Sequence, residues 1–309
     1  TSIDYKDTKR ITDTPEQERD LDFNSDGTKL MYSGERNDSW NIYEASLKRD
    51  EEKYFYNATL IEEKPLVVTD QETFQASYSP DDKEISFLEN RTTIRIKNIA
   101  TGDVRTVMAG DMQYSYSDGD QSHTWSPDSK WITYTTQLKN RLGVVKVYSL
   151  GTKKSSQLTD GLSDARFAAF DRSGKYIYFT ASTDVGPTTG WLDMSGFPFN
   201  ITRSVYAVVL KNSDPSPLSP ESDEEKIKPD PPKTPKKPTS KKKPAAKKKP
   251  EKTVKIDFAG IDQRIVSLPL AARNYVGLTT GLDGTFFLFD INPLVSSESG
   301  VIISYHPTL

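Results

Sequence analysis

The stretch "DLDFNSDGTKLMYSG", residues 20–34, fits either a metal site or a turn between two strands. Asp22, Asn24 and Asp26, followed by a glycine, match the first half of an EF-hand calcium loop. That loop also needs a bidentate Glu at its twelfth position, where this chain has Ser33. Because Gly tolerates a positive φ and Asp can bond its own backbone, the same residues suit a tight turn. The pattern favours a β-hairpin.

Four further segments repeat the features of this stretch, which are an aromatic residue, a turn, and then a run of β-branched and aromatic residues. They are "QASYSPDDKEISFLE" (75–89), "SHTWSPDSKWITYTT" (122–136), "FAAFDRSGKYIYFTA" (167–181) and the weaker "YVGLTTGLDGTFFLFDI" (275–291). The first four copies, marked by Asp26, Asp81, Asp128 and Ser173, are 55, 47 and 45 residues apart. The position of Asp22 changes to Ser77, Thr124 and Ala169, so the calcium-like pattern is not part of the repeat.

Each repeat contains four runs with strand patterning. In the third repeat these runs are 121–126, 131–138, 142–150 and 155–160. Four strands at such a period are typical of a propeller blade, and blades pack side by side because one blade cannot bury both of its faces. No long stretch shows helical periodicity. The sequence predicts an all-β fold, a single β-propeller domain over 1–309 with about five four-stranded blades.

The repeat also shows where inserted residues occur and which parts of a blade the two chain ends would form. Residues 48–64 form an insertion in blade one, and residues 183–203 form another in blade four. "RIVSLPL" (264–270) matches the fourth strands of the other blades. We expect residues 2–15 to form the last two strands of an earlier blade, and the chain to stop soon after blade five's second strand. Either the termini complete a shared blade and close a small ring, or the chain is part of a larger ring.

A lysine- and proline-rich insertion interrupts the domain at about 214–253. It holds ten of the nineteen prolines and no aromatic residue. Eleven Lys and one Glu between Lys233 and Lys255 give this part +10, and the rest of the chain carries −13. Such a composition predicts disorder. A nucleic-acid-binding arm is the alternative, but no aromatics are interleaved to stack on bases, so we predict a solvated insertion and no nucleic-acid partner.

Composition excludes several classes of chemistry. The chain has no Cys, which excludes disulfides, thiol nucleophiles and Cys-based metal sites. No apolar run approaches the ~20 residues of a membrane helix, and the polar beginning "TSIDYKDTKR" is unlike a signal peptide. We expect a protein with no membrane partner. The absence of Cys fits an exported protein, periplasmic or secreted, and leaves a cytoplasmic one open.

Candidate catalytic and metal-binding residues are few. The two histidines are His123, where two sister repeats have Ala, and His306 near the end of the chain. A structural His123 on an inner strand is favoured over a catalytic base, since no activated Ser or phosphate loop accompanies it. Asp118 and Asp120 are a weak cation candidate that we interpret as an ordinary loop pair. The sequence predicts no catalytic residue, no cofactor and no metal site.

Two further features leave alternatives open. The aromatic residues of the insertions either pack onto a blade or face a partner; they are Tyr54, Phe55, Tyr56, Trp191, Phe197 and Phe199. The N-x-[ST] sequons matter only if the source organism glycosylates proteins; they begin at Asn37, Asn57, Asn90 and Asn200.

The blocks "TGWLDMSGF", "TRSVYAVVL", "PSPLSPESDEE" and "KIDFAGIDQRIVSLPLAARNYVGL" carry a more specific signal than the repeats. In this order they resemble the second propeller of bacterial tricorn protease homologues, and more distantly TolB-like propellers. The resemblance covers nearly the whole chain. It implies a seven-bladed ring, of which about five blades are visible here.

The resemblance also implies a function. In that family two propellers precede a PDZ-like module and a serine peptidase core of the tail-specific type, and they filter or channel unfolded peptides. None of the family's catalytic motifs occurs here, so we expect a non-catalytic region whose partners are peptides and the PDZ and peptidase domains. A homo-oligomer of the parent serine endopeptidase is a further expectation. The alternative is a stand-alone TolB-like propeller that binds proteins, and the gene sequence after Leu309 separates the two.

Overall fold

The computed structural model describes residues 8–110, 121–183, 201–219 and 252–290, and the backbone of 301–305. These residues form nineteen strands in five antiparallel sheets and two short 3-10 helices, η1 (Phe55–Asn57) and η2 (Ile261–Arg264). This confirms the all-β prediction and the number of blades. Neither of these helices approaches the length needed to cross a lipid bilayer, and no other helix of the described part does either.

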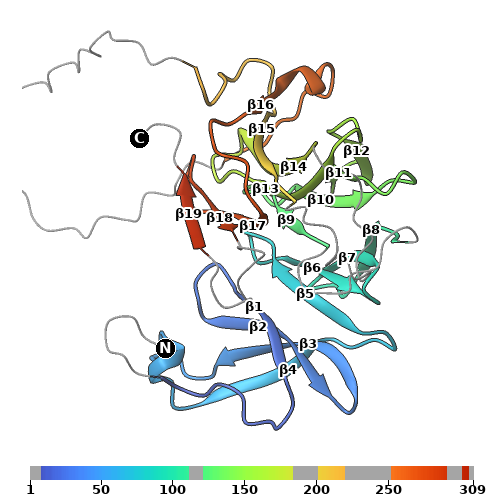
Figure 1. Ribbon diagram of the computed structural model, residues 1–309. Coiled ribbons are helices and arrows are strands. Elements are labelled where there is room, and N and C mark those ends of the chain that lie inside the picture. Colours follow the sequence, from blue (N-terminus) through green and yellow to red (C-terminus); the bar gives the residue numbers. More distant parts are fainter. Residues whose placement is uncertain (1–7, 111–120, 184–200, 220–251, 291–300, 306–309) are drawn as a thin grey trace, which may run out of the picture.

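Each sheet is formed by strands that are consecutive in the sequence. The strands are, in sheet 1, β1 (Glu18–Phe23), β2 (Lys29–Arg36), β3 (Ser39–Leu47) and β4 (Ile61–Val67); in sheet 2, β5 (Thr73–Tyr78), β6 (Glu84–Glu89), β7 (Thr93–Asn98) and β8 (Val104–Met108); in sheet 3, β9 (His123–Trp125), β10 (Trp131–Gln137), β11 (Gly143–Ser149) and β12 (Lys154–Gln157); in sheet 4, β13 (Asp164–Phe170), β14 (Tyr176–Ser182), β15 (Ser204–Val209) and β16 (Ile265–Ser267); and in sheet 5, β17 (Tyr275–Thr280), β18 (Phe286–Asp290) and β19 (Val301–Tyr305). The first strand of every sheet lies toward the middle of the molecule and the last toward its margin (Figure 1). This is the arrangement of propeller blades.

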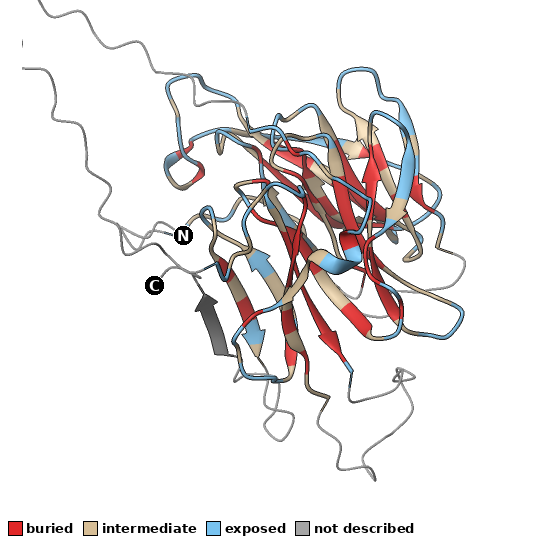
Figure 2. Ribbon diagram, turned by 90° about the horizontal axis from the view of Figure 1, so that it is seen from above, coloured by how far each residue is buried: buried red, intermediate tan, exposed pale blue. Residues whose placement is uncertain are grey.

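The core lies between consecutive sheets. In each of sheets 2 to 5, two apolar residues of the second strand face the preceding sheet. They are Ile85 and Phe87, Ile132 and Tyr134, Ile177 and Phe179, and Phe286 and Leu288, each at most 2% exposed. Figure 2 shows the buried residues, in red, gathered along the strands in the interior of the molecule. The sequence repeat therefore reflects packing: in each of these sheets, the same two positions of the second strand contact the preceding sheet.

Three details of the sequence prediction were wrong. The fourth strand of sheet 1 begins at Ile61, inside the insertion predicted for 48–64. It includes Pro65, which an edge strand tolerates because one side of its backbone makes no ladder bonds. Sheet 5 has a third strand, β19, paired with β18, so the chain does not stop after two strands. Residues 8–15, predicted as part of an earlier blade, form no strand.

The lysine- and proline-rich insertion is only partly within the described structure. Its central part, 220–251, lies outside the described residues, so the prediction of disorder stays untested. Its flanks at 214–219 and 252–253 belong to the folded part. The Tyr176 hydroxyl donates to the carbonyl of Pro215 at 3.0 Å, and Lys252 Nζ donates to the carbonyl of Arg172 at 2.8 Å. The insertion thus leaves and re-enters beside sheet 4.

Sheets 3 and 4 approach closely where β11 begins. A Cβ atom on Gly143 would lie 2.4 Å from the carbonyl oxygen of Ala165, a backbone atom that cannot move aside easily. The Gly143 amide also donates to Asp164 Oδ1 at 2.9 Å. Glycine is therefore required here by space rather than by its backbone angles.

We expect Gly143→Ala to lower the free energy of unfolding by about 1–3 kcal/mol, because the added methyl group overpacks the contact between sheets 3 and 4. Gly151→Ala is the matched control, since its nearest new neighbour would be 3.9 Å away. Urea denaturation of the two variants measures the difference. Equal stabilities for both variants would contradict this account of the contact.

Candidate functional site: the inner strands and their turns

The inner strands, β1, β5, β9, β13 and β17, are the parts of the sheets that lie nearest one another (Figure 1). Three of them contain a bulge with a non-glycine residue at positive φ: Asp20 at 54°, Gln75 at 53° and Phe167 at 56°. The pairing register with the second strand shifts at each of these points. A bulge bends the strand and redirects its side chains, so these positions set how neighbouring sheets meet at the centre.

Sheet 1 binds the inner strand of sheet 2 through two carboxylates. Asp20 Oδ2 accepts from the Gln75 amide at 2.9 Å, and Asp22 Oδ2 accepts from the Tyr78 amide at 2.8 Å. The amide of Ser79 already pairs with Glu84 of β6, so by the alternation of an antiparallel ladder the Tyr78 amide points to the other edge. The free edge of β5 is therefore partly occupied by side chains of its neighbour.

The next sheet adds a contact of the same kind. Trp125 Nε1 of β9 donates to the carbonyl of Ser77 on β5 at 3.2 Å. Side chains that occupy edge groups in this way reduce the tendency of the strand to pair with another chain. A peptide reaching β5 would have to compete with these bonds for the same backbone groups.

Two residues of the calcium-like pattern bond the hairpin, and the third, Asp22, bonds the next sheet. Asn24 Oδ1 accepts from the Lys29 amide at 2.9 Å, and Asp26 Oδ1 accepts from the Thr28 amide at 3.0 Å. These contacts, with the pairing of β1 and β2, confirm that the stretch is a hairpin. Over the described ranges, no group of three or more His, Asp or Glu side chains is placed to hold a metal ion. Asp118 and Asp120 lie outside them.

Similar turns link one sheet to the next at the same end of the molecule. The Ser25 amide donates to Asp82 at 2.9 Å, and the Asp81 amide donates to Ser129 Oγ at 3.1 Å. Further along, Asp128 and Asp171 accept from the amides of Val254 and Gly284 at 2.9 and 2.8 Å. The acidic side chains of these turns therefore bond neighbouring parts of the chain to one another. The sequence showed that the turns contain Asp residues, but not that these residues bond other segments.

Two buried charge clusters were not anticipated from the sequence. Glu44 is fully buried, accepts from the Tyr78 hydroxyl at 2.7 Å and lies 2.9 Å from Lys64 Nζ. Burial alone would raise the pKa of Glu44, but the bond from Tyr78 and the lysine charges together lower it. At neutral pH this carboxylate is charged and engaged, which does not suit a general acid.

The second cluster joins Asp164 and Arg203. Arg203 Nη2 lies 2.6 Å from Asp164 Oδ2, Nη1 donates to the Asp164 carbonyl at 2.7 Å, and both side chains are 6% exposed. Burial opposes ionisation of Asp164, but the charges of Arg166 and Arg203 outweigh it and lower the pKa. In the sequence, Arg203 stood only as the last residue of the blade-four insertion (183–203), with nothing to indicate its pairing with Asp164.

His123 lies on β9, as predicted, opposite Tyr134. Neither ring nitrogen makes a hydrogen bond of good geometry among the described residues, and burial lowers the pKa of His123 to about 4, against a smaller opposing effect of the Gln121 backbone. A neutral imidazole of this kind does not form the Ser-His-Asp arrangement of hydrolases. His306 lies outside the described residues, and the prediction that the chain has no catalytic residue stays a prediction.

The aromatic residues of the first insertion divide between the two alternatives. Phe55 packs onto sheet 1 and is 8% exposed, whereas Tyr54 is 57% exposed and stacks on Tyr56 at 5.6 Å. The three aromatic residues of the second insertion lie outside the described ranges.

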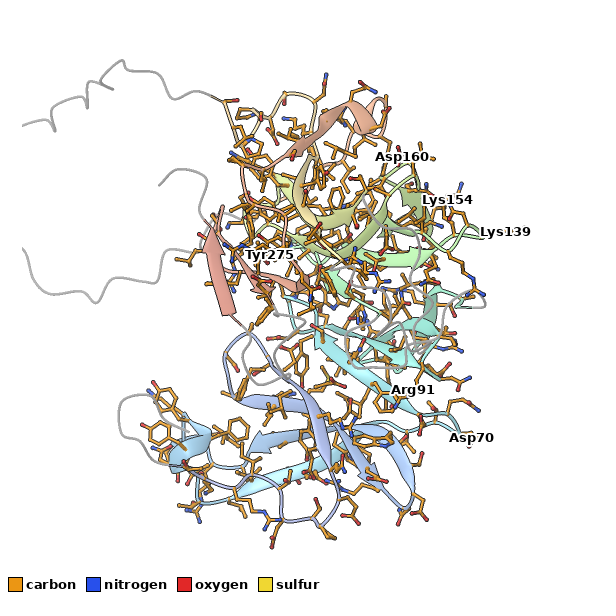
Figure 3. The ribbon with its side chains drawn as sticks, in the orientation of Figure 1. Asp70, Arg91, Lys139, Lys154, Asp160 and Tyr275 are labelled. Carbon is orange, nitrogen blue, oxygen red and sulfur yellow. The ribbon has the colours of Figure 1, made fainter. Side chains whose placement is uncertain are left out.

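Figure 3 shows that Asp70 lies at the outer margin, far from the inner strands, while Tyr275 of β17 points into the interior.

We expect Asp22→Ala to destabilise the protein by about 1–3 kcal/mol, because it leaves the Tyr78 amide without its acceptor. Asp70→Ala is the control for removing an acid from the exposed surface, and it should change stability by less than about 0.5 kcal/mol. Denaturant unfolding at pH 7 compares the two. If Asp22→Ala is as neutral as the control, the contact between β1 and β5 does not stabilise the array.

We expect His123→Ala to reduce the loss of stability in acid. The unfolded chain binds a proton near pH 6.5 and the folded chain only near pH 4, so wild-type stability falls as the pH drops through this window. Alanine occupies the equivalent positions 76 and 168, which makes it the natural replacement. Denaturation from pH 7 to pH 4 should show a shallower decline for the variant. Parallel curves would mean that His123 titrates normally in the folded protein.

Comparison with known proteins shows which family has this architecture. The model of the "Tricorn protease second beta propeller domain" family matches residues 13–302. The chain is 24% identical over 215 residues to the putative Tricorn-like protease C-terminal subunit of Sulfurisphaera tokodaii, covering 69% of this chain and 21% of that protein. It is 26% identical over 213 residues to Tricorn protease homolog 1 of Streptomyces coelicolor, covering 68% and 18%. The chain thus spans about a fifth of the length of these relatives.

Solved structures agree on the fold. The crystal structure of the tricorn protease matches with a TM-score of 0.64 and 14% identity, over 96% of this chain and 26% of that one. The structure of putative TolB from Agrobacterium tumefaciens matches with a TM-score of 0.55 and 12% identity, over 96% and 79%. At such identities these matches bear on the fold alone. Because the family model covers most of the residues, the chain belongs to the family of tricorn protease second β-propeller domains.

Proposed function

We propose that this chain is the non-catalytic propeller region of a tricorn-like serine peptidase, and that it filters or channels unfolded peptides for a protease core elsewhere in the parent protein. The match of the family model over residues 13–302 carries this proposal. The relatives are a Tricorn-like protease subunit and Tricorn protease homologues, and the chain spans only about a fifth of their length. A peptidase activity would therefore belong to other parts of the parent.

The roles of the described acidic and basic groups support a non-catalytic region. Asp22, Glu44 and Asp164 are committed to contacts between strands or sheets, and the His123 ring makes no hydrogen bond of good geometry in the part of the chain that the structure describes. A nucleophile needs an adjacent base that is itself oriented by a third group. The groups above are each engaged elsewhere or isolated, so they supply no such arrangement.

The partners that fit this role are extended peptides and the PDZ and peptidase domains of the parent. Oligomerisation of the parent and export to the periplasm or beyond are further parts of the proposal. A stand-alone TolB-like propeller that binds proteins remains the second candidate, favoured by the similarity to putative TolB over 79% of that chain. In the first candidate the propeller guides peptides to a protease core, whereas in the second it binds other proteins and serves no protease.

We expect the purified chain to bind a fluorescently labelled unstructured peptide, measured by anisotropy, without cleaving it. A folded protein of similar charge is the control and should not compete. Hydrolysis that survives re-purification would overturn the non-catalytic assignment.

Peptide cleavage by the parent protein separates the two candidates. The channelling role predicts that deleting the propeller slows hydrolysis of long unfolded substrates more than that of short peptides, because short peptides need no guidance. Equal effects on both, or no peptide binding by the chain, would favour the protein-binding alternative.

A further inference from the structure

Sheet 3 carries a group of basic side chains in an otherwise acidic molecule. Residues 129–159, from the turn between β9 and β10 to just past β12, contain six basic residues and no acidic one. Outside 233–255 the chain has a net charge of −13. This sheet is therefore a local region of positive charge.

These basic side chains have no acidic partner among the described residues. None of the six forms an ion pair there. All but one of them are exposed, the exception being Lys146, which is half-buried. The six are Lys130, Lys139, Arg141, Lys146, Lys153 and Lys154.

The neighbouring sheet 2 pairs its basic side chains internally. Arg95 lies 2.5 Å from Glu89, and Arg105 lies 2.6 Å from Glu84. The other three basic side chains of residues 73–108 also have partners, an acid for two of them and a carbonyl for the third. The bases of sheet 3, by contrast, are left available to an anionic group of another molecule.

The acidic side chains that flank residues 129–159 are already engaged. Asp128 Oδ2 and Asp160 Oδ1 each accept from a backbone amide at 2.9 Å, and Asp164 pairs with Arg203. None of these three carboxylates pairs with a basic side chain of sheet 3. The positive charge is therefore not neutralised by the nearest acids in the sequence.

Four of the exposed bases lie at the two ends of β11 and β12, and we call them the basic margin. Lys139 and Arg141 belong to the turn between β10 and β11, and Lys153 and Lys154 lie where β11 turns into β12. Figure 3 shows Lys139 and Lys154 at the outer margin of the molecule. Because β11 has seven residues, a strand's rise of ~3.3 Å per residue separates the two pairs by roughly 20 Å.

Between these pairs, the edge of β12 offers backbone hydrogen bonds. β12 is the last strand of sheet 3, with β11 on its inner side. The Leu158 amide donates to the carbonyl of Val145 on β11 at 2.9 Å. By the alternation of an antiparallel ladder, the backbone groups of Ser155 and Gln157 therefore point to the outer edge. Both residues are exposed.

The charges beside this edge select the strand that can pair with it. Lysines at a sheet edge deter pairing with a strand of like charge. They attract a strand that carries carboxylates, because complementary charges steer association and suppress wrong partners. The strand itself, "KSSQ", contains no proline or acidic residue that would oppose such pairing.

The surface favours an acidic polypeptide over a nucleic acid. Single-stranded nucleic acids bind by stacking their bases on aromatic rings, but Trp125, Tyr134 and Tyr148 of sheet 3 are each at most 8% exposed. The ring of Trp131 lies against that of Phe258, with centroids 6.1 Å apart. A polypeptide needs no such rings, since its backbone bonds the strand edge directly.

We propose that the basic margin and the edge of β12 form a docking surface for an acidic, extended segment of a partner protein. Carboxylates of the segment pair with the four bases, and its backbone bonds that of Ser155 and Gln157. The surface lies at the outer margin, so the proposal does not rest on the channelling of peptides by the inner strands.

Binding of a fluorescently labelled acidic peptide, measured by anisotropy, tests this surface. An eight-residue peptide with two Glu at each end and Val and Thr between them is long enough to span the margin at ~3.3 Å per residue. We expect Lys139→Ala, Arg141→Ala, Lys153→Ala and Lys154→Ala together to weaken binding at least about tenfold, because four modest ion pairs are lost at once. These side chains are exposed, so circular dichroism should show an unchanged fold.

Lysines of the insertion provide a control of equal charge. Lys241→Ala, Lys242→Ala, Lys243→Ala and Lys247→Ala together should weaken binding less than about twofold. An equal or larger loss with this control, or no binding by the unaltered protein, would overturn the proposal. Tighter binding of a single-stranded oligonucleotide of equal charge, abolished by the margin substitutions, would assign the surface to nucleic acid instead. A neutral peptide bound by the inner strands should be unaffected by either set.

Pairing with the edge of β12 has its own test. Ser155→Pro removes an amide hydrogen at the outer edge, where proline is tolerated because no ladder bond is lost. Ser155→Ala is the matched control, since it keeps this amide and removes only the hydroxyl that Tyr134 bonds. We expect the proline variant to bind the acidic peptide about fivefold more weakly than the alanine variant. Equal affinities would show that the peptide does not pair with β12.

Discussion

The packing of each sheet on its predecessor is the constraint from which the rest of the structure follows. A four-stranded sheet cannot bury both faces alone, and this chain solves the problem with two apolar residues after each inner turn. In sheet 2 these are Ile85 and Phe87, and their equivalents recur in every later sheet. The first sheet has the equivalent residues Leu30 and Tyr32 but no described predecessor, and Phe55, from the connection between β3 and β4, packs on them.

Charged groups near the centre serve this packing. Asp20 and Asp22 bond the inner edge of β5, Glu44 bonds Tyr78 between sheets 1 and 2, and Asp164 with Arg203 stabilises the start of β13. Each of these carboxylates has a bonding partner within the described part of the propeller, which stabilises the array.

Much of this fold was readable from the sequence because the period and the turn chemistry are local. The spacing of Asp26, Asp81 and Asp128 predicted the blades, and the loss of the would-be ligand Asp22 in sister repeats predicted a hairpin. The missed features depend on contacts distant in sequence. Whether Phe55 packs inward depends on the uncovered face of sheet 1, and the pairing of Asp164 with Arg203 spans 39 residues. The start of β4 was missed because it contains Pro65. A strand accepts proline only at the edge of a sheet, and the sequence did not show that β4 lies there.

Amide hydrogen exchange along the second strands tests the central claim most directly. The packing account predicts that β2 (Lys29–Arg36) exchanges as slowly as β6, β10 and β14, because Leu30 and Tyr32 on its outer side are buried, with Phe55 packed against them. It also predicts that β18, whose outer side carries the exposed Phe289, exchanges faster than these four. Rapid exchange in β2, at the rate of a strand with one open face, would contradict the account.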